Sequence, residues 1–354
     1  MDAAEGLQQH FSSSSQSHHI VAHFRRSWNV PPVAPRRRFP DRMDQVSNVS
    51  TVRVFHLAAF NETLNHRITI FCLSLLCYSV ILLVNVSLIV TIVLDENLHE
   101  PMYILLCVCC INALYGTTGF YPKFLADLLS SAQVISYGGC LCQAFVMYSF
   151  VCSDTSILAV MAYDRYLAIC RPLRYSSVMT RKRISELVLF SWLTPFCVFS
   201  VNILLTSRLT FCDADIQRLF CVNWLIVELA CPDMDTVVNN AFAFATLSIY
   251  ICHWLFVVWT YVYLVQTCLH SKEDRAKFMQ TCLPNLISLV TFFVIVVSDI
   301  MHMRYASEDL PQGFHNFVAL AVLVVPPVLN PLLYGFKMTK IRNSIFVLVH
   351  VRWK

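Results

Sequence analysis

The stretch MAYDRYLAIC, Met161–Cys170, decides the fold because it places two adjacent charges, Asp164 and Arg165, at the end of a long apolar run. The 30 residues of that run, Val134–Tyr163, include a single ionisable acid, Asp154. A helix needs about 20 apolar residues to cross a bilayer, so this run is long enough. We therefore expect a membrane-spanning helix whose end is marked by the charged pair.

The whole chain has the composition of a membrane protein. Hydrophobic residues make up 57% of the 354 positions and charged residues 14%, which leaves too little polar surface for a soluble globule. Backbone groups in lipid must bond internally, and the apolar runs lack the alternation of barrel strands, so helices are expected. The predicted fold class is all-α, a seven-transmembrane helix bundle. The predicted spans are Ile68–Leu94, Met102–Tyr121, Val134–Tyr163, Leu187–Ser207, Thr236–Leu269, Phe278–Ser298 and Gly313–Phe336.

Lysine and arginine indicate the orientation of this bundle. Segments 171–183, 271–277 and 337–354 contain 13 of them. The opposite connections contain four, which are Lys123, Arg208, Arg218 and Arg304. Cytoplasmic loops carry the basic excess, so we expect the N-terminus outside and the C-terminus inside. This topology accounts for the net charge of +4, so membrane lipids are the expected partners and no nucleic acid is expected.

The N-terminal segments differ from the apolar spans. Residues 1–42 combine six arginines with a serine run and contain no apolar stretch, so we expect disorder. We interpret them as an extension before a start at Met43, with an organellar transit peptide as the alternative. Sequons at Asn48 and Asn61 predict glycosylation. The expected domains are the extension (1–42), an extracellular leader (43–67), the helical domain (68–336) and a cytoplasmic tail with a short amphipathic eighth helix (337–354).

Four of the sixteen cysteines stand out by position. Cys140 begins the third predicted span at its outer end, whereas Cys212, Cys221 and Cys231 lie in the long outer loop 208–235. An extracellular location favours disulfides. Spacing alone leaves all three connectivities of four cysteines open.

Two features of the spans are polar. Asp154 lies ten residues before Asp164, about 15 Å along a helix. Such an acid usually faces the bundle interior and pairs with a cation, a partner side chain or a proton; the alternative is a protonated aspartate that only joins helices. In the last span, Asn330 and Pro331 predict a kink whose freed carbonyl groups Asn330 can satisfy. Together with the charged pair, this kink predicts a switch that works by helix displacement.

Five ordered motifs carry a family resemblance. They are LHEPMY (Leu98–Tyr103), Pro122-Lys123, MAYDRYLAICRPLRY (Met161–Tyr175), KFMQTC (Lys277–Cys282) and PPVLNPLLYGFK (Pro326–Lys337). On these motifs the chain resembles the odorant receptors of the rhodopsin-like G-protein-coupled class, most closely the fish type. The resemblance implies a plasma-membrane receptor with no enzymatic activity and no cofactor. It would bind a small organic odorant from outside and activate a heterotrimeric G protein that raises cyclic AMP.

The resemblance also implies roles for individual residues. Arg165 would be held by Asp164 at rest and released on activation. The implied switch and G-protein coupling residues are Asp164, Arg165, Tyr166, Tyr261, Asn330, Pro331 and Tyr334. The implied disulfides are Cys140–Cys221 and Cys212–Cys231. The expected ligand pocket comprises Met147, Tyr148, Val151, Cys152, Phe293, Val296, Val297, Ile300 and Leu320, with charges only at its outer rim.

The sequence departs from the family at two places. Ala113 stands where many members of the class carry a second-helix aspartate, so a sodium site that uses two acids is expected to be weakened. Asp154, Asn112 and Asn85 form the expected intramembrane polar site. In the sixth span, Phe293 is expected to replace the usual aromatic switch.

Other functions fit the sequence less well. A receptor of the same class for a peptide or an amine is the nearest alternative. A transporter or channel would normally show several ionisable groups along a pathway, or repeats with broken helices, and Asp154 alone makes a poor pathway.

Overall fold

The computed structural model describes residues 54–57, 64–130, 132–268, 272–305 and 312–351. All of them belong to the compact unit Thr51–Lys354. The predictions for residues 1–42 and for the sequons at Asn48 and Asn61 lie outside the described residues.

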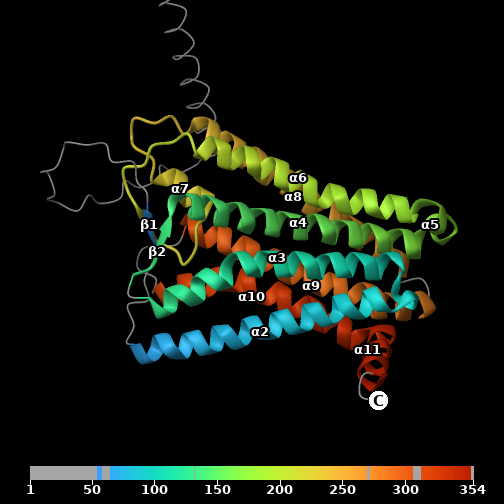
Figure 1. The fold of residues 1–354 in the computed structure, drawn as a ribbon. Helices are drawn as coiled ribbons and strands as arrows, with labels where there is room; N and C mark the ends of the chain where they lie inside the picture. Colours follow the sequence, from blue (N-terminus) through green and yellow to red (C-terminus); the bar gives the residue numbers. More distant parts are fainter. Residues whose placement is uncertain (1–53, 58–63, 131, 269–271, 306–311, 352–354) are drawn as a thin grey trace, which may run out of the picture. The chain divides into compact units, whose positions relative to one another are not determined.

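Seven long helices run side by side in the described part of the chain (Figure 1). Each contains a stretch long and apolar enough to cross a membrane, which confirms the predicted seven-helix fold class. The seven are α2 (Leu64–Leu94), α3 (Pro101–Leu129), α4 (Tyr137–Cys170), α6 (Arg181–Thr206), α8 (Val237–Cys268), α9 (Lys272–Tyr305) and α10 (Gln312–Lys337). Shorter helical elements are η1 (Glu96–Leu98), α5 (Pro172–Val178), α7 (Asn223–Glu228) and α11 (Thr339–Val351).

The helix ends differ from the predicted spans at several places, and two of these differences change the local structure. The third span does not begin at Val134, because Val134–Ser136 form strand β2, and α4 starts at Tyr137 with the Ser136 hydroxyl accepting from the Gly139 amide at 3.2 Å. The second helix does not end at Tyr121 but continues to Leu129. Lys123 pairs with Asp127 one turn later on this extension, so its charges are satisfied within the helix.

A small sheet, which was not predicted from the sequence, lies at one end of the bundle. Strand β1 (Val54–Leu57) lies between β2, to which it is antiparallel, and β3 (Asp215–Ile216), to which it is parallel. Phe55 of β1 is fully buried and packs against the rings of Tyr137 and Phe211. The sheet therefore joins the segment before α2 to two loops at what we call the disulfide end.

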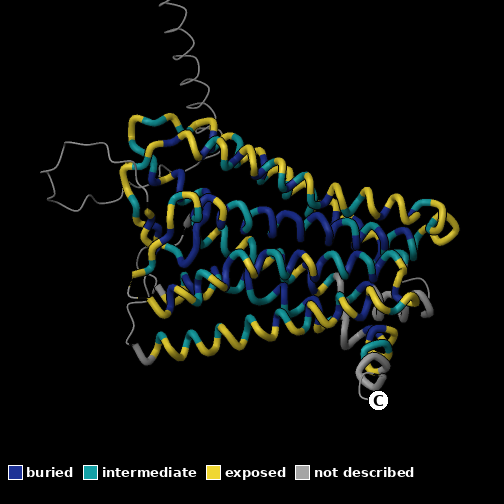
Figure 2. Tube along the Cα trace, in the orientation of Figure 1, coloured by how far each residue is buried: buried dark blue, intermediate teal, exposed yellow. Residues whose placement is uncertain are grey.

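Helix α4 lies at the centre of the bundle and contacts α3, α6, α8 and α9. In the most apolar stretch of α4, 67% of the residues are buried, against 56% in α3 and 11% in α8. Figure 2 shows this burial along the helices. The approach of α3 to α4 depends on Gly116, since a Cβ there would lie 2.3 Å from Cγ of Phe150. The exposed apolar faces of α8 suit contact with lipid, and the polar residues of α4 are enclosed by other helices.

Helix α11 follows α10 at the opposite end, which we call the Asp164 end. Ile341 is fully buried and Ile345 packs against the core, whereas Lys340, Arg342 and Asn343 are exposed. One apolar stripe and one polar face make α11 amphipathic, as predicted for the short eighth helix.

Candidate ligand and switch sites

A buried polar cluster joins four helices in the middle of the bundle. Asn112 of α3 donates to Asp154 of α4 at 3.3 Å and to the Phe150 carbonyl at 3.1 Å. The thiol of Cys109 lies 3.6 Å from the same Asp154 oxygen and accepts from Asn330 of α10 at 3.4 Å. Ser288 of α9 donates to the Asn330 amide oxygen. This chain of contacts links α4 to α10 and α9 through α3.

The backbone carbonyl that Pro331 leaves without a donor in α10 is bound by a different residue from the one expected. Pro331 has no N–H to donate to the carbonyl of Pro327 four residues earlier. Asn85 of α2 donates to that carbonyl at 2.9 Å and to the Ile81 carbonyl at 2.8 Å. The expectation that Asn330 satisfies the freed carbonyl was therefore wrong, because Asn330 is engaged by Ser288 and Cys109.

Three oxygen atoms of the expected intramembrane polar site are buried without a hydrogen-bond partner among the described residues. They are Oδ1 of Asn85, Oδ1 of Asn112 and Oδ2 of Asp154. Each can accept a hydrogen bond from a water molecule or a protonated group, and buried polar atoms normally find such a partner. Within the described residues, no group of three or more His, Cys, Asp or Glu side chains could hold a metal ion.

The charged pair Asp164 and Arg165 forms an ion pair at the Asp164 end of the bundle. Arg165 donates through Nε to Asp164 at 2.8 Å and contacts the same oxygen through a second nitrogen. Tyr175 of α5 donates to the other Asp164 oxygen at 2.9 Å. Burial and the neighbouring carboxylate raise the pKa of the Tyr175 hydroxyl, so it stays protonated and remains a donor. Asp164 is fully buried, and these two partners compensate its charge.

The other residues expected in the switch lie nearby. The ring of Tyr166 meets that of Tyr263 on α8 edge to face, with centroids 5.6 Å apart. Tyr261 is buried in the core around α4. The side chain of Tyr334 lies outside the described residues.

The two disulfides lie at the disulfide end. Cys140 at the start of α4 bonds to Cys221, and Cys212 bonds to Cys231 within the same loop. These are the pairings that the resemblance implies. Gln143 of α4 supports the first bond by accepting from the Cys221 amide at 2.9 Å. The loop is therefore held across the mouth of the bundle by covalent and polar contacts.

The residues expected in the pocket come from α4, α9 and α10. Tyr148 stacks on Phe199 of α6, and Phe293 stacks on Trp254 of α8 with centroids 3.6 Å apart. Of the remaining members, Met147 and Cys152 are buried, Val151, Val296, Ile300 and Leu320 are half-buried, and Val297 is exposed. Tyr148 therefore lies at the interface with α6 and Phe293 at the interface with α8.

An ion pair lies at the disulfide end, and one of its partners, Asp299, was among the charges expected at the rim of the pocket. Arg218 of the disulfide loop forks onto both carboxylate oxygens of Asp299 on α9. The Arg218 guanidinium also lies 5.2 Å from the ring centre of Phe220. Both charged side chains are largely buried, so each compensates the other.

Comparison with known proteins identifies the family. A model of the olfactory receptor family matches residues 71–351. The chain belongs to the olfactory receptor family. It is 31% identical over 277 residues to olfactory receptor 52D1 of Homo sapiens, which covers 77% of this chain and 87% of that protein. It is 33% identical over 276 residues to olfactory receptor 52K1 of Homo sapiens, with 77% and 87% covered. It is 31% identical over 302 residues to olfactory receptor 6E1 of Mus musculus, with 84% and 95% covered.

Several contacts of this olfactory receptor were not predictable from its sequence. Tyr175 belongs to a motif that carried the resemblance, yet nothing in the motif showed that its hydroxyl bonds to Asp164. Ser288 lies one turn after the atypical pair Pro284-Asn285, and only its position opposite Asn330 gives it a role. For Ser288 the available signal was a polar side chain in an apolar span, whereas Tyr175 lies outside the spans and offered only its place in the motif.

Proposed function

We propose that this olfactory receptor binds a small, largely apolar odorant in the half of the bundle nearest the disulfides and activates a heterotrimeric G protein at the Asp164 end. The disulfide end would face outside and the basic Asp164 end the cytoplasm of an olfactory neuron. Coupling to a stimulatory G protein would raise cyclic AMP.

The single observation that carries this proposal is the arrangement around Arg165. A buried aspartate holds the guanidinium, and a tyrosine from the next helix completes the coordination of that aspartate. Breaking the pair of Asp164 with Arg165 costs free energy because it leaves a buried charge uncompensated. A state with the pair formed and a state with the pair broken therefore differ in free energy. A ligand changes the balance only if it binds one state more tightly. Arg165 would be released in the state that accepts the G protein.

The buried polar cluster supports a coupling between the expected ligand pocket and the Asp164 end. Asp154 lies between the expected pocket on α4 and the charged pair, and Asn330 and Ser288 tie α10 to α9. A displacement of α9 must change the Ser288–Asn330 contact. We propose that odorant binding rearranges this contact and thereby allows α9 to move away from α4.

The ion pair of Arg218 with Asp299 supports an uncharged ligand. Arg218 and Asp299 neutralise each other, and the residues expected below them are mainly apolar. A strongly charged odorant would have to displace one partner of a largely buried ion pair, which is costly. Uncharged organic odorants are therefore favoured over the amines and peptides that define the alternative.

The test uses Arg165→Ala, after a broad odorant panel has identified an agonist by cyclic-AMP response. We expect the agonist response to disappear while surface delivery persists. Lys182→Ala is the matched control, because it removes an exposed basic side chain near the same end of the bundle. Undiminished signalling by Arg165→Ala at normal surface delivery would refute the proposed role.

A further inference from the structure

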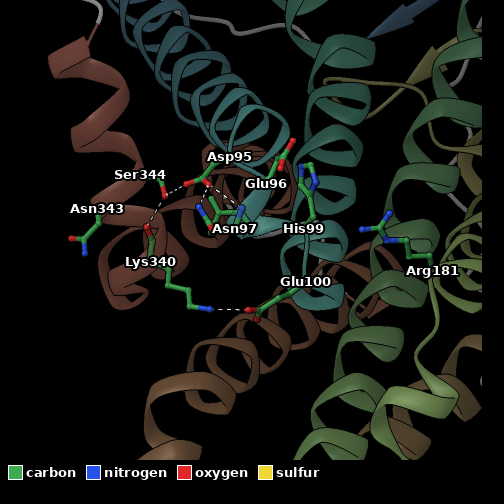
Figure 3. A pocket seen from close by; sticks show the side chains of 10 residues that line it. Asp95, Glu96, Asn97, His99, Glu100, Arg181, Lys340, Asn343 and Ser344 are labelled. Carbon is green, nitrogen blue, oxygen red and sulfur yellow. Dashed lines mark hydrogen bonds and ion pairs between the residues drawn. The ribbon is translucent and has the colours of Figure 1, made fainter.

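An open pocket of about 640 Å³ lies beside α11 at the Asp164 end. Figure 3 shows the side chains that line it. Its walls come from the connection between α2 and α3, the start of α6 and one face of α11. Asp95, Glu100, Arg181, Lys340 and Ser344 contribute charged or hydroxyl groups to it. Ser344 therefore lies at an opening that the functions assigned so far do not use.

Two polar contacts hold α11 to the α2–α3 connection. The Ser344 hydroxyl lies within hydrogen-bond distance of Asp95 and, at 3.0 Å, of the Lys340 carbonyl in its own helix, and the charged carboxylate is the stronger acceptor for its single hydrogen. The Lys340 ammonium pairs with Glu100 at 2.7 Å. Asp95 also caps η1 by accepting from the backbone and side chain of Asn97. The hydrogen bond from Ser344, followed by those from Asn97, lowers the pKa of Asp95, so this carboxylate is charged at neutral pH. The Ser344 hydroxyl thus faces a full negative charge.

The sequence around Ser344 has the charge pattern of a basophilic kinase substrate. Lys340 and Arg342 precede it by four and two residues, and acidic residues do not intervene. Basic residues at these positions complement an acidic substrate groove. Helix α11 has 13 residues, a length at which an isolated helix is marginal, so local unwinding can present Ser344 in extended form.

We propose that Ser344 is a phosphorylation site whose modification releases α11 from the α2–α3 connection. This site rests on the proposed function in one respect, the cytoplasmic location of the Asp164 end. In the transfer step the Ser344 oxygen attacks the γ-phosphorus of a nucleoside triphosphate, and the bond to the β–γ bridging oxygen breaks. The nucleoside diphosphate leaves, and the hydroxyl proton passes to a carboxylate of the kinase.

Phosphorylation would reverse the contact with Asp95. The hydroxyl hydrogen that donates to Asp95 is lost, and a group of about −1.5 to −2 charge takes its place opposite a carboxylate. Lys340 lies four residues earlier on the same helix face, so the phosphate competes with Glu100 for its ammonium group. One modification therefore removes the contact with Asp95 and weakens the pair of Lys340 with Glu100.

The first experiment asks whether the site is modified. The purified full-length receptor in lipid nanodiscs, with both faces accessible, is incubated with ATP and an arginine-directed serine kinase, and phosphopeptides are mapped by mass spectrometry. We expect phosphate on Ser344 in the wild type and none at this position in Ser344→Ala. Ser185 is the internal control, because it is exposed and follows Arg181, Lys182 and Arg183. Phosphate on Ser185 with none on Ser344 would overturn the proposal.

The second experiment asks whether the charge releases α11. Hydrogen exchange of residues 339–351 is measured for Ser344→Glu, Ser344→Ala and the double variant Ser344→Glu with Asp95→Asn. We expect exchange about tenfold faster in Ser344→Glu, the size of losing one hydrogen bond to a charged group, and slower exchange again in the double variant. Wild-type exchange in Ser344→Glu would contradict the release. Neither experiment uses an odorant or a G protein, so a failure here is separate from a failure of the proposed coupling.

Discussion

Replacing Gly116 by alanine tests whether the close approach of α3 and α4 holds the polar cluster together. The added Cβ would lie 2.3, 2.5 and 2.8 Å from three ring carbons of Phe150, a fully buried side chain. Carbon atoms pack at about 3.5–4.0 Å, so the two helices must separate locally by about 1.2 Å, the difference between 3.5 and 2.3 Å. We expect the substitution to destabilise the receptor.

The magnitude follows from two effects. Overpacking of this kind costs about 1–3 kcal/mol. The bond from Asn112 to the Phe150 carbonyl, now 3.1 Å, lies one helical turn away and would stretch, which adds about 1 kcal/mol. The higher helix propensity of alanine offsets up to about 1 kcal/mol. The net cost of about 1–3 kcal/mol corresponds to a fall in Tm of roughly 3–10 °C.

Thermal unfolding of the detergent-solubilised receptor measures this effect through a fluorophore that reacts with thiols as they become exposed. Cys109, Cys110, Cys152 and Cys282 are buried cysteines outside the two disulfides and supply the signal. Gly138→Ala is the matched control, because a Cβ there meets nothing within 4 Å. Equal Tm values for the two variants would show that α3 and α4 can separate locally with no loss of stability, which would refute the expected effect.

Three further substitutions test other contacts. Cys212→Ser leaves Cys231 unpaired in the loop and should reduce surface delivery, whereas Cys72→Ser changes an exposed free cysteine and should not; equal delivery would exclude a structural role for this disulfide. Asn85→Ala leaves the Pro327 carbonyl without its donor, and we expect a loss of about 1–3 kcal/mol, seen as a lower Tm than for Ser87→Ala at an exposed position of α2. Phe55→Ala removes a fully buried ring, so cleavage of the segment before α2 by added protease should accelerate; an unchanged rate would mean that the sheet contributes little stability.

The Asp164 end shows how far local sequence information extends. The family resemblance that the motif carries implied the ion pair of Asp164 with Arg165, and the structure contains this pair between two residues that are adjacent in the chain. Tyr175 lies eleven residues later, beyond the end of α4, and its bond to Asp164 depends on how α5 turns back. The motif therefore indicated the importance of the region without indicating this partner.

The sequence by itself determined the seven spans and the family, because both are recorded in runs and motifs that are local along the chain. Only the tertiary structure decided which polar side chains meet. Asn85 reaches the carbonyl of Pro327 across 242 positions, and Ser288 reaches Asn330 across 42. The hydropathy of a segment predicts that it spans the membrane but does not predict how the helix is rotated about its axis. A hydrogen bond between two helices forms only when their rotation and depth bring donor and acceptor within about 3 Å.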